Sequence, residues 1–189
     1  MSRPDLEIAK FFKDLFGTNV RVGCEGGVET VDKTHQMIHR GDLFSAGHIF
    51  ESVSDNSSRY ILFKADEGVE IHLVLSATTR GNARFYIYED PQLTTNGTPL
   101  TISSHNRRMI KPSQAQVWHT PTFSNKGDQI NGTHLVAGGS GNQAVGASTR
   151  LFNNELVLDS EKFYLFEIEN RAGNNSTIAG YATYYIERL

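Results

Sequence analysis

Two histidines four residues apart, His35 and His39, have the spacing in this sequence that comes closest to a metal site. The interval places both side chains on one face of a helix or strand, from which two imidazoles can hold one ion. A third ligand is not evident, since the sequence has neither HExxH nor an HxH pair followed by Glu. We therefore predict that the pair is structural and that the chain uses no metal or other cofactor.

The other motifs that could support catalysis are incomplete. Gly139-Ser140-Gly141 lacks the spacing of a nucleophile elbow, and the glycine-rich stretch around it lacks the Lys of a phosphate-binding loop. Glu167 and Glu169 share one face of a predicted strand, where exposure to solvent explains their charge. The other histidines stand singly in strands or loops: His48, His72, His105, His119 and His134. We expect no catalytic residue and no enzymatic activity.

The elements that would position these residues are mostly short strands. Ile71, Leu73 and Leu75 alternate with polar residues in the stretch Gly68–Pro91, and a second β-favouring run, Phe85–Tyr88, follows after a glycine-containing turn. This pattern predicts an antiparallel hairpin with a long turn.

Turn residues divide the rest of the chain into more strands, eight or nine in total. The further predicted strands are Arg59–Lys64, Leu100–Ser103, Gln116–Phe123, Glu155–Leu158, Phe163–Glu169 and Thr177–Ile186. Pro121 cannot donate to a ladder, so we place Gln116–Phe123 at a sheet edge. Glu29–Phe50 fits either strands or one helical turn. The pattern favours an all-β fold, an antiparallel two-sheet sandwich of jelly-roll type, with a closed barrel as the alternative.

The N-terminal stretch differs from this pattern. Leu6–Phe16 is predicted to be a short amphipathic helix that ends at Gly17, followed by a glycine-rich linker. We therefore divide the chain into an N-terminal arm and linker (1–28) and a jelly-roll domain (29–189). A helix this short needs a docking surface, either on its own domain or on another subunit.

Composition excludes several classes of partner. The net charge of −3 and the scattered Lys and Arg residues give no basis for binding nucleic acid. No apolar stretch is long enough to cross a membrane, and the N-terminus does not have the pattern of a secretion signal. The single cysteine, Cys24, excludes an intrachain disulfide.

Several blocks of sequence, in the same order, carry a resemblance to a known group. These blocks are VDKTHQMIHRGDLFSAGHIF, VWHTPTFSNKGD, HLVAGGSGNQAVGAS and FYLFEIENRAG. From about Glu29 to the C-terminus the chain resembles the jelly-roll capsid cement or decoration proteins of tailed bacteriophages. The resemblance implies a homotrimer without catalytic residues, made in the host cytoplasm and bound to the major capsid protein on the outer surface of the virion.

We expect the arm and two loops, His105–Gln114 and Gly138–Gly146, to contact the capsid or sister subunits. The candidate contact residues are Phe11, Phe12, Leu15, Phe16, Arg107 and Arg108. Two other functions remain open. A receptor- or carbohydrate-binding module of a phage tail or head fibre predicts a groove lined by exposed aromatics such as Trp118, Tyr86 or Tyr88. A metal-dependent jelly-roll enzyme predicts that His35, His39 and a third ligand converge.

Overall fold

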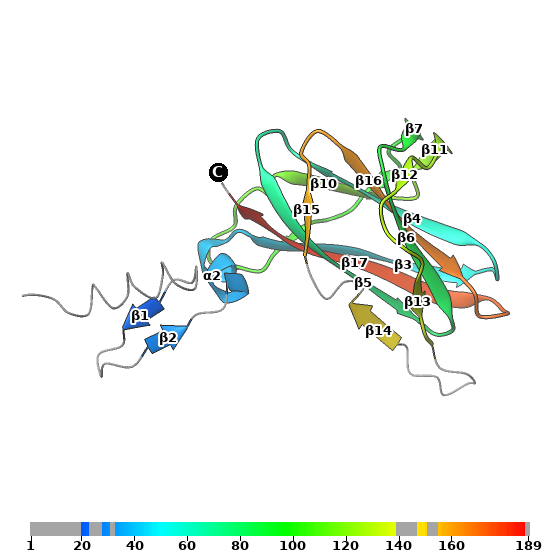
Figure 1. Ribbon diagram of the computed structural model, residues 1–189, viewed down its shortest axis with the longest axis horizontal. Coiled ribbons are helices and arrows are strands. Elements are labelled where there is room, and N and C mark those ends of the chain that lie inside the picture. The colour runs from blue at the N-terminus through cyan, green and yellow to red at the C-terminus, as the bar shows by residue number, and fades with distance from the viewer. Residues whose placement is uncertain (1–19, 23–27, 31–32, 139–146, 151–154, 188–189) are drawn as a thin grey trace, which may run out of the picture.

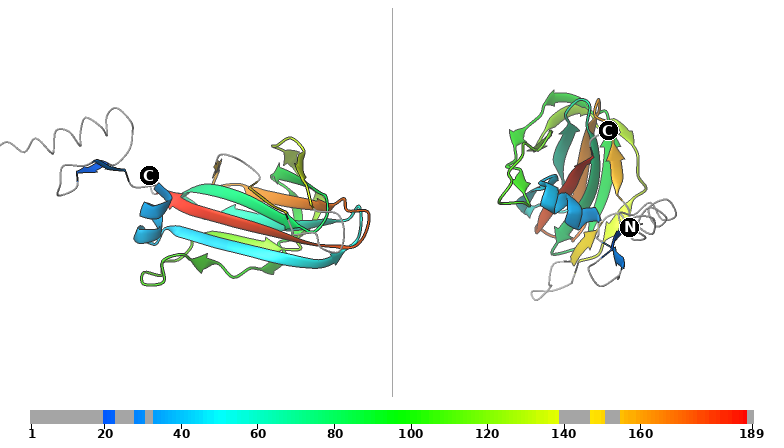
Figure 2. Two further views of the ribbon diagram at one scale, coloured as in Figure 1. Left: turned by 90° about the horizontal axis from the view of Figure 1, so that it is seen from below. Right: turned by 90° about the vertical axis from the view of Figure 1, so that its left-hand side faces the viewer.

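The computed structural model describes residues 20–22, 28–30, 33–138, 147–150 and 155–187. Most of them lie in two antiparallel β-sheets that pack face to face, with one short helix, α2, at one end of the sandwich (Figure 1, Figure 2). The C-terminal end of the last strand lies at the same end as α2 (Figure 2).

The first sheet has six strands among the described residues. In spatial order they are β14 (Ala147–Arg150), β5 (Glu70–Thr79), β17 (Ser176–Glu187), β3 (Leu43–Val53) and β9 (Ser103–Ser104), with β15 (Leu156–Leu158) also paired to β5. β17 is the longest of these strands and lies between β5 and β3 along most of its length. β17 is therefore paired along both of its edges.

The second sheet has seven strands in the described part of the chain. Their order is β12 (Asp128–Gln129), β6 (Ala83–Glu89), β16 (Phe163–Asn170), β4 (Ser58–Ala65), β10 (Ala115–His119) and β8 (Thr98–Pro99), with β13 (His134–Val136) also paired to β6. Two separate ribbons are formed by β7 (Gln92–Thr95) with β11 (Thr122–Asn125) and by β1 (Val20–Val22) with β2 (Val28–Thr30).

The chain alternates between the two sheets, as a jelly roll requires. β3, β5 and β17 lie in one sheet, and β4, β6 and β16, which alternate with them in sequence, lie in the other. The predicted all-β two-sheet sandwich is therefore confirmed. The predicted hairpin of β5 and β6 is wrong, because these strands belong to different sheets. The three residues Arg80–Asn82 carry the chain across the sandwich instead of folding it back.

The main core lies between the sheets. Ile71, Leu73 and Leu75 on β5 point into it, as their alternation predicted. Tyr184 from β17 is fully buried, and its ring packs edge to face on Phe63 from β4 with the centroids 5.1 Å apart. Burial of one such side chain contributes about 1.5–3 kcal/mol to stability.

A smaller core lies on the outer face of the seven-stranded sheet. Leu62, Leu165 and Trp118 are buried there, with Leu93 from β7 and Phe123 from β11 packed on them. The β7–β11 ribbon thus covers this face.

Four predicted strands match observed strands closely: Arg59–Lys64 with β4, Glu155–Leu158 with β15, Phe163–Glu169 with β16 and Thr177–Ile186 with β17. The predicted edge strand Gln116–Phe123 is wrong, because the chain forms β10 and β11 on either side of Thr120 and Pro121. Pro121 has no N–H, so the ladder stops before it, and β10 has partners on both sides, β4 and β8.

Two further segments differ from prediction. Leu100–Ser103 is not one strand, because Leu100 and Ile102 pack against the core while the chain passes from β8 in one sheet to β9 in the other. Glu29–Phe50 contains an eight-residue helix followed by the long strand β3. The predicted helix Leu6–Phe16 and most of the loop Gly138–Gly146 lie outside the described residues, so the division into an arm and a domain stays a prediction.

Candidate functional site

The end of the sandwich that carries α2 brings together most of the predicted contact residues within the described chain. α2 (Lys33–Arg40) ends at Gly41, whose φ of +73° is left-handed and favours glycine. Met37 is its buried residue and packs with Leu43 and Tyr185 on the outer face of the six-stranded sheet. These contacts fix the helix across that end of the sheet.

A loop held in a defined shape lies against the end of α2. The side-chain oxygen of Asn106 accepts hydrogen bonds from the backbone N–H groups of Arg108 and Met109, each at 3.0 Å. The amide nitrogen of Asn106 donates to the carbonyl oxygen of His39 at 3.0 Å. Asn106 therefore shapes the loop and attaches it to the helix.

The far side of the loop is anchored by an ion pair. The Lys111 ammonium lies 2.7 Å from a carboxylate oxygen of Asp42, a residue that is almost fully buried. The backbone of the loop also lies close to Gly41, since a Cβ added at Gly41 would lie 2.7 Å from the carbonyl oxygen of Met109. The loop is thus fixed at Asn106, at Lys111 and along its contact with Gly41.

The tip of this loop is exposed. Arg107 and Arg108 are exposed, as contact with a capsid or a sister subunit requires. Met109 and Ile110, which are 50% and 69% exposed, continue the same surface. The sequence analysis named Arg107 and Arg108 as contact candidates and did not single out the two apolar residues. We call the four residues Arg107–Ile110 the contact loop.

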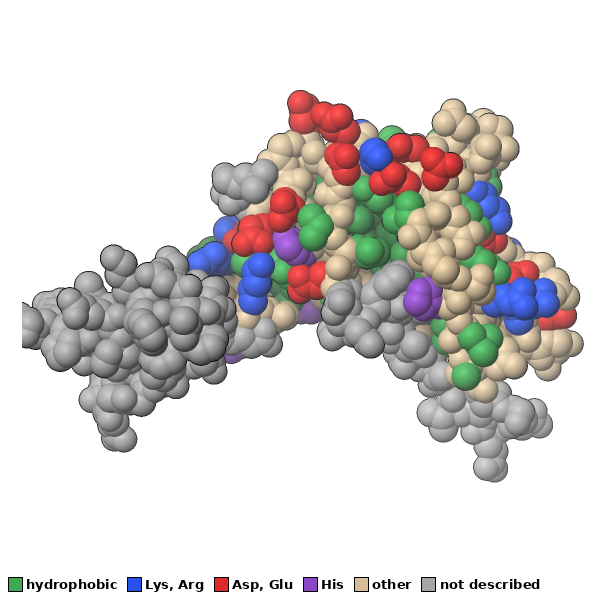
Figure 3. All heavy atoms as spheres, in the orientation of Figure 1, with side chains coloured by type: hydrophobic (Ala, Val, Ile, Leu, Met, Phe, Trp, Pro, Cys, Tyr) green, Lys and Arg blue, Asp and Glu red, His purple; other side chains and the backbone are tan. Residues whose placement is uncertain are grey.

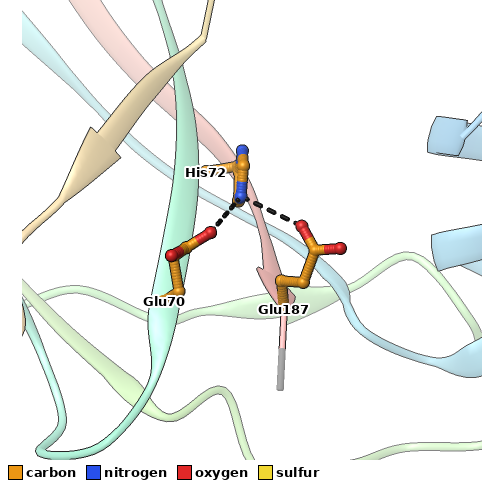
Figure 4. A group of neighbouring side chains, drawn as sticks. All are labelled: Glu70, His72 and Glu187. Carbon is orange, nitrogen blue, oxygen red and sulfur yellow. Dashed lines mark hydrogen bonds and ion pairs between the residues drawn. The ribbon is translucent and has the colours of Figure 1, made fainter. Parts of the chain in front are cut away.

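A group of charged side chains lies at the same end of the sandwich. Glu70 and His72 on β5 and Glu187 on β17 offer three possible ligand atoms within 4.8 Å of one another (Figure 4). Figure 3 shows acidic, basic and histidine side chains gathered on this face beside α2. The sequence analysis missed the group and treated His72 as a single polar residue. The Glu-x-His spacing on one strand was a signal, but Glu187 comes from the other end of the chain.

The predicted histidine pair is also in this region. His35 and His39 lie side by side on α2, with 3.0 Å between their Nε2 atoms, and both are exposed. No third His, Cys, Asp or Glu joins them among the residues that the structure describes. The convergence expected for a metal-dependent enzyme centred on this pair is therefore not seen there.

Glu167 on β16 is not the exposed residue that was predicted. It is 3% exposed and accepts hydrogen bonds from Ser58 at 2.5 Å, Tyr88 at 3.0 Å and Lys126 at 2.7 Å. Burial alone would raise the pKa of Glu167, but the hydrogen bonds from Lys126 and Ser58 outweigh it, so the pKa is lowered. Burial and the bond to Glu167 raise the pKa of Tyr88 to about 12. This cluster is a buried, satisfied network that joins the β11–β12 connection to the sheet.

The aromatic groove expected for a carbohydrate-binding module does not form around Trp118, which is buried. Tyr86 and Tyr88 are half-buried, and their hydroxyls donate to Glu169 and Glu167. None of the three is available as a freely exposed stacking surface.

The outer face of the six-stranded sheet is uncharged across its centre. The residues that share this face between β5, β17 and β3 are Val74, Ser76, Thr78, Ala179, Tyr181, Thr183, Ser45, Gly47 and Ile49. Tyr181 is 40% exposed and Ile49 is 54% exposed. An uncharged face with exposed Tyr181 and Ile49 suits contact with another protein surface.

Two imidazoles stack across the sandwich near the β3 and β10 strands. The rings of His48 and His119 are parallel within 10°, and their centroids are 3.8 Å apart. Burial, together with the charge of His119, lowers the pKa of His48. The stack links the two sheets, since His48 lies on β3 and His119 on β10.

Comparisons with known proteins do not identify a family. No family model matches the chain, and no curated protein matches it. Among solved structures, the chain has 10% identity and a TM-score of 0.13 to the infectious bursal disease virus VP2 subviral particle, over 89% of this chain and 46% of that chain. The chain thus spans about half the length of that structure. A similarity this low carries no argument about function.

The one helix among the described residues is too short to span a membrane.

Proposed function

We propose that this chain is a non-enzymatic structural protein of a virion, a cement or decoration protein that binds the outer surface of a bacteriophage capsid and stabilises it. The observation that supports the proposal best is the contact loop, in which exposed Met109 and Ile110 stand beside Arg107 and Arg108. Apolar side chains gain free energy when a partner covers them, and arginine is enriched among residues that dominate binding.

The hydrogen bonds of Asn106 and the ion pair of Lys111, which fix the loop, support the same function. Asn106 and Lys111 hold the loop in place before any partner binds. A preformed loop loses less conformational entropy on binding, so more of its contact energy appears as affinity. A capsid offers the same surface many times, and several weak contacts made together bind far more strongly than one.

Two further features fit this arrangement. The arm with Phe11, Phe12, Leu15 and Phe16 precedes α2 in the sequence, and α2 contacts the loop that carries the contact residues. In this proposal the arm and the loop both bind the major capsid protein or a sister copy. The uncharged outer face around Tyr181 provides a surface for the sister copies of a homotrimer.

Co-sedimentation with capsids tests the proposal. The full chain is mixed with shells of the virus that encodes it, assembled without this protein, and the bound fraction is measured against concentration. We expect saturable binding by the wild type. For Met109→Ser/Ile110→Ser we expect about tenfold weaker binding or more, because each exposed apolar contact contributes roughly 1 kcal/mol.

A matched control is the variant Leu135→Ser/Ile130→Ser, which removes two apolar residues that are 65% and 44% exposed near β13. It should bind shells as the wild type does. Deletion of residues 1–16 should weaken binding and leave the thermal unfolding of the sandwich unchanged. A full chain that does not bind shells refutes the proposal, and a truncated chain that binds as well as the full chain refutes the role of the arm.

A further inference from the structure

The group of charged residues beside α2 is built from two neighbouring strands. Glu70 and His72 are two residues apart on β5, so they share a face, and the pairing of Glu187 with Glu70 places a third side chain on that face. His72 Nε2 lies 2.9 Å from Glu70 Oε1 and 3.1 Å from Glu187 Oε2 (Figure 4). Three donor atoms therefore converge on one point at the sheet surface.

The other ring nitrogen of His72, Nδ1, contacts a separate carboxylate. Nδ1 lies 3.1 Å from Glu155 Oε2, and that oxygen accepts a hydrogen bond from the Tyr185 hydroxyl at 2.6 Å. The Tyr185 ring also stacks on the imidazole, 4.6 Å away and tilted by 9°. A carboxylate behind the imidazole fixes the proton on Nδ1 and turns Nε2 towards the two other carboxylates. Histidines that bind metal ions commonly donate their other ring N–H to a carboxylate in this way.

The charges around these three donor atoms favour the binding of a cation. Three carboxylates, Glu70, Glu155 and Glu187, gather around His72. The cationic side chains that act on them are Lys33, which lies 2.9 Å from Glu187 Oε2, and Arg40, so the carboxylates outnumber the cations. With Nδ1 protonated, a neutral imidazole would direct its Nε2 lone pair at two negative oxygens. A proton or a metal ion between these atoms removes the repulsion.

We propose that Glu70, His72 and Glu187 form a binding site for a divalent transition-metal ion such as Zn²⁺ or Mn²⁺. Donor atoms that each lie about 2.0–2.2 Å from one zinc ion are roughly 3–3.5 Å from one another. The two spacings from His72 Nε2, 2.9 and 3.1 Å, are close to this range, and all three atoms lie within 4.8 Å of one another. One imidazole and two carboxylates suit these ions, whereas Ca²⁺ and Mg²⁺ prefer oxygen ligands only. The side chains of Glu70 and Glu187 are 34% and 39% exposed, so an ion can enter and keep water as its remaining ligand.

The bound ion would join parts of the chain that are far apart in sequence. Glu70 and His72 belong to β5 and Glu187 to the end of β17, while Glu155 precedes β15 and Lys33 begins α2. The ion thus joins β5 to β17 at the end of the sandwich that carries α2. This inference does not depend on the proposed function, because metal binding is measured on the isolated protein.

Thermal unfolding with added metal tests the site. The full chain is freed of metal with a chelator and titrated with ZnCl₂ or MnCl₂, and equilibrium dialysis counts the bound ions. We expect one ion per chain and an increase in melting temperature of about 5–10 °C when the free metal is 100 times its dissociation constant. CaCl₂ and MgCl₂ should bind at least tenfold more weakly.

Two variants separate this site from the exposed histidine pair on α2. His35→Gln/His39→Gln should keep the metal-dependent shift, and Glu70→Gln/Glu187→Gln should lose it while retaining the circular dichroism of the wild type. In wild-type protein, NMR of ¹⁵N-histidine should show Zn²⁺ changing the Nε2 signal of His72 and leaving His48 unaffected. No shift with any metal, a shift that disappears in the His35/His39 variant, equal binding of Ca²⁺, or an unchanged His72 signal would each overturn the proposal.

Discussion

Glu167→Gln isolates the buried carboxylate that joins the β11–β12 connection to the seven-stranded sheet. The substitution keeps the size of the side chain but removes its charge and directs an NH₂ group at the donors Lys126, Ser58 and Tyr88. Loss of one partner of a buried ion pair costs about 3–5 kcal/mol, but the Lys126 side chain is 37% exposed and can regain water. We therefore expect a loss of about 2–3 kcal/mol in the free energy of unfolding.

Urea denaturation at pH 7, followed by the fluorescence of buried Trp118, measures this loss. Glu169→Gln is the matched control on the same strand, because its contacts with Tyr86 and Arg171 are both 3.4 Å long, and it should cost less than about 1 kcal/mol.

The pH dependence gives a second test of Glu167. Its pKa is lowered in the folded protein, so its stabilising contribution is complete above the unfolded value of about 4.3 and is lost as the pH falls through the folded value. The difference between wild type and Glu167→Gln should shrink over that acidic range. Equal and small losses for the two glutamate variants, or a difference that does not change with pH, would refute this reasoning.

Three shorter predictions follow from other contacts. Gly41→Ala should destabilise the protein by about 1–3 kcal/mol in urea denaturation, because the position has positive φ and the new Cβ meets the backbone of the contact loop; an unchanged midpoint would contradict this. The lowered pKa of His48 means that wild-type stability falls as the pH drops from about 6.5 towards the folded value. His48→Phe should therefore show less loss of melting temperature between pH 7 and pH 5, and an identical loss would count against the stacked pair. Tyr181→Asp should lower the mass measured by light scattering if the uncharged face joins sister copies, whereas an unchanged oligomer would exclude that face.

Local patterns predicted most of the individual strands. Alternation on β5 identified Ile71, Leu73 and Leu75 as core residues, and the same rule located β16 and β17. Pairing between strands was harder to predict, because the small and polar residues between the two runs suit a hairpin turn and a crossing between sheets equally well. The choice between a hairpin and a crossing depends on how the two sheets cover each other's apolar faces. This is a property of the whole fold and not of the local sequence.

In the candidate sites as well, local sequence predicted some features, while others depend on contacts between distant segments. The exposure of Arg107 and Arg108 could be predicted from a polar stretch without periodicity. The role of Asn106 could not, because its partners are the backbone of its own loop and the end of α2. The burial of Glu167 was also missed, since a carboxylate on a strand usually faces water. Its partners are Ser58, Tyr88 and Lys126, which no local pattern connects to β16.

Hydrogen exchange on shell-bound protein tests the central claim most directly, namely that the α2 end of the sandwich binds the capsid. Deuterium uptake is compared between the free protein and the protein bound to empty shells. We predict that binding protects the amides of Arg107–Ile110 and of α2 and leaves those of the β7–β11 ribbon, which lies at the other end of the sandwich (Figure 1), unchanged. Protection confined to that ribbon, with no change in the contact loop, would contradict the account.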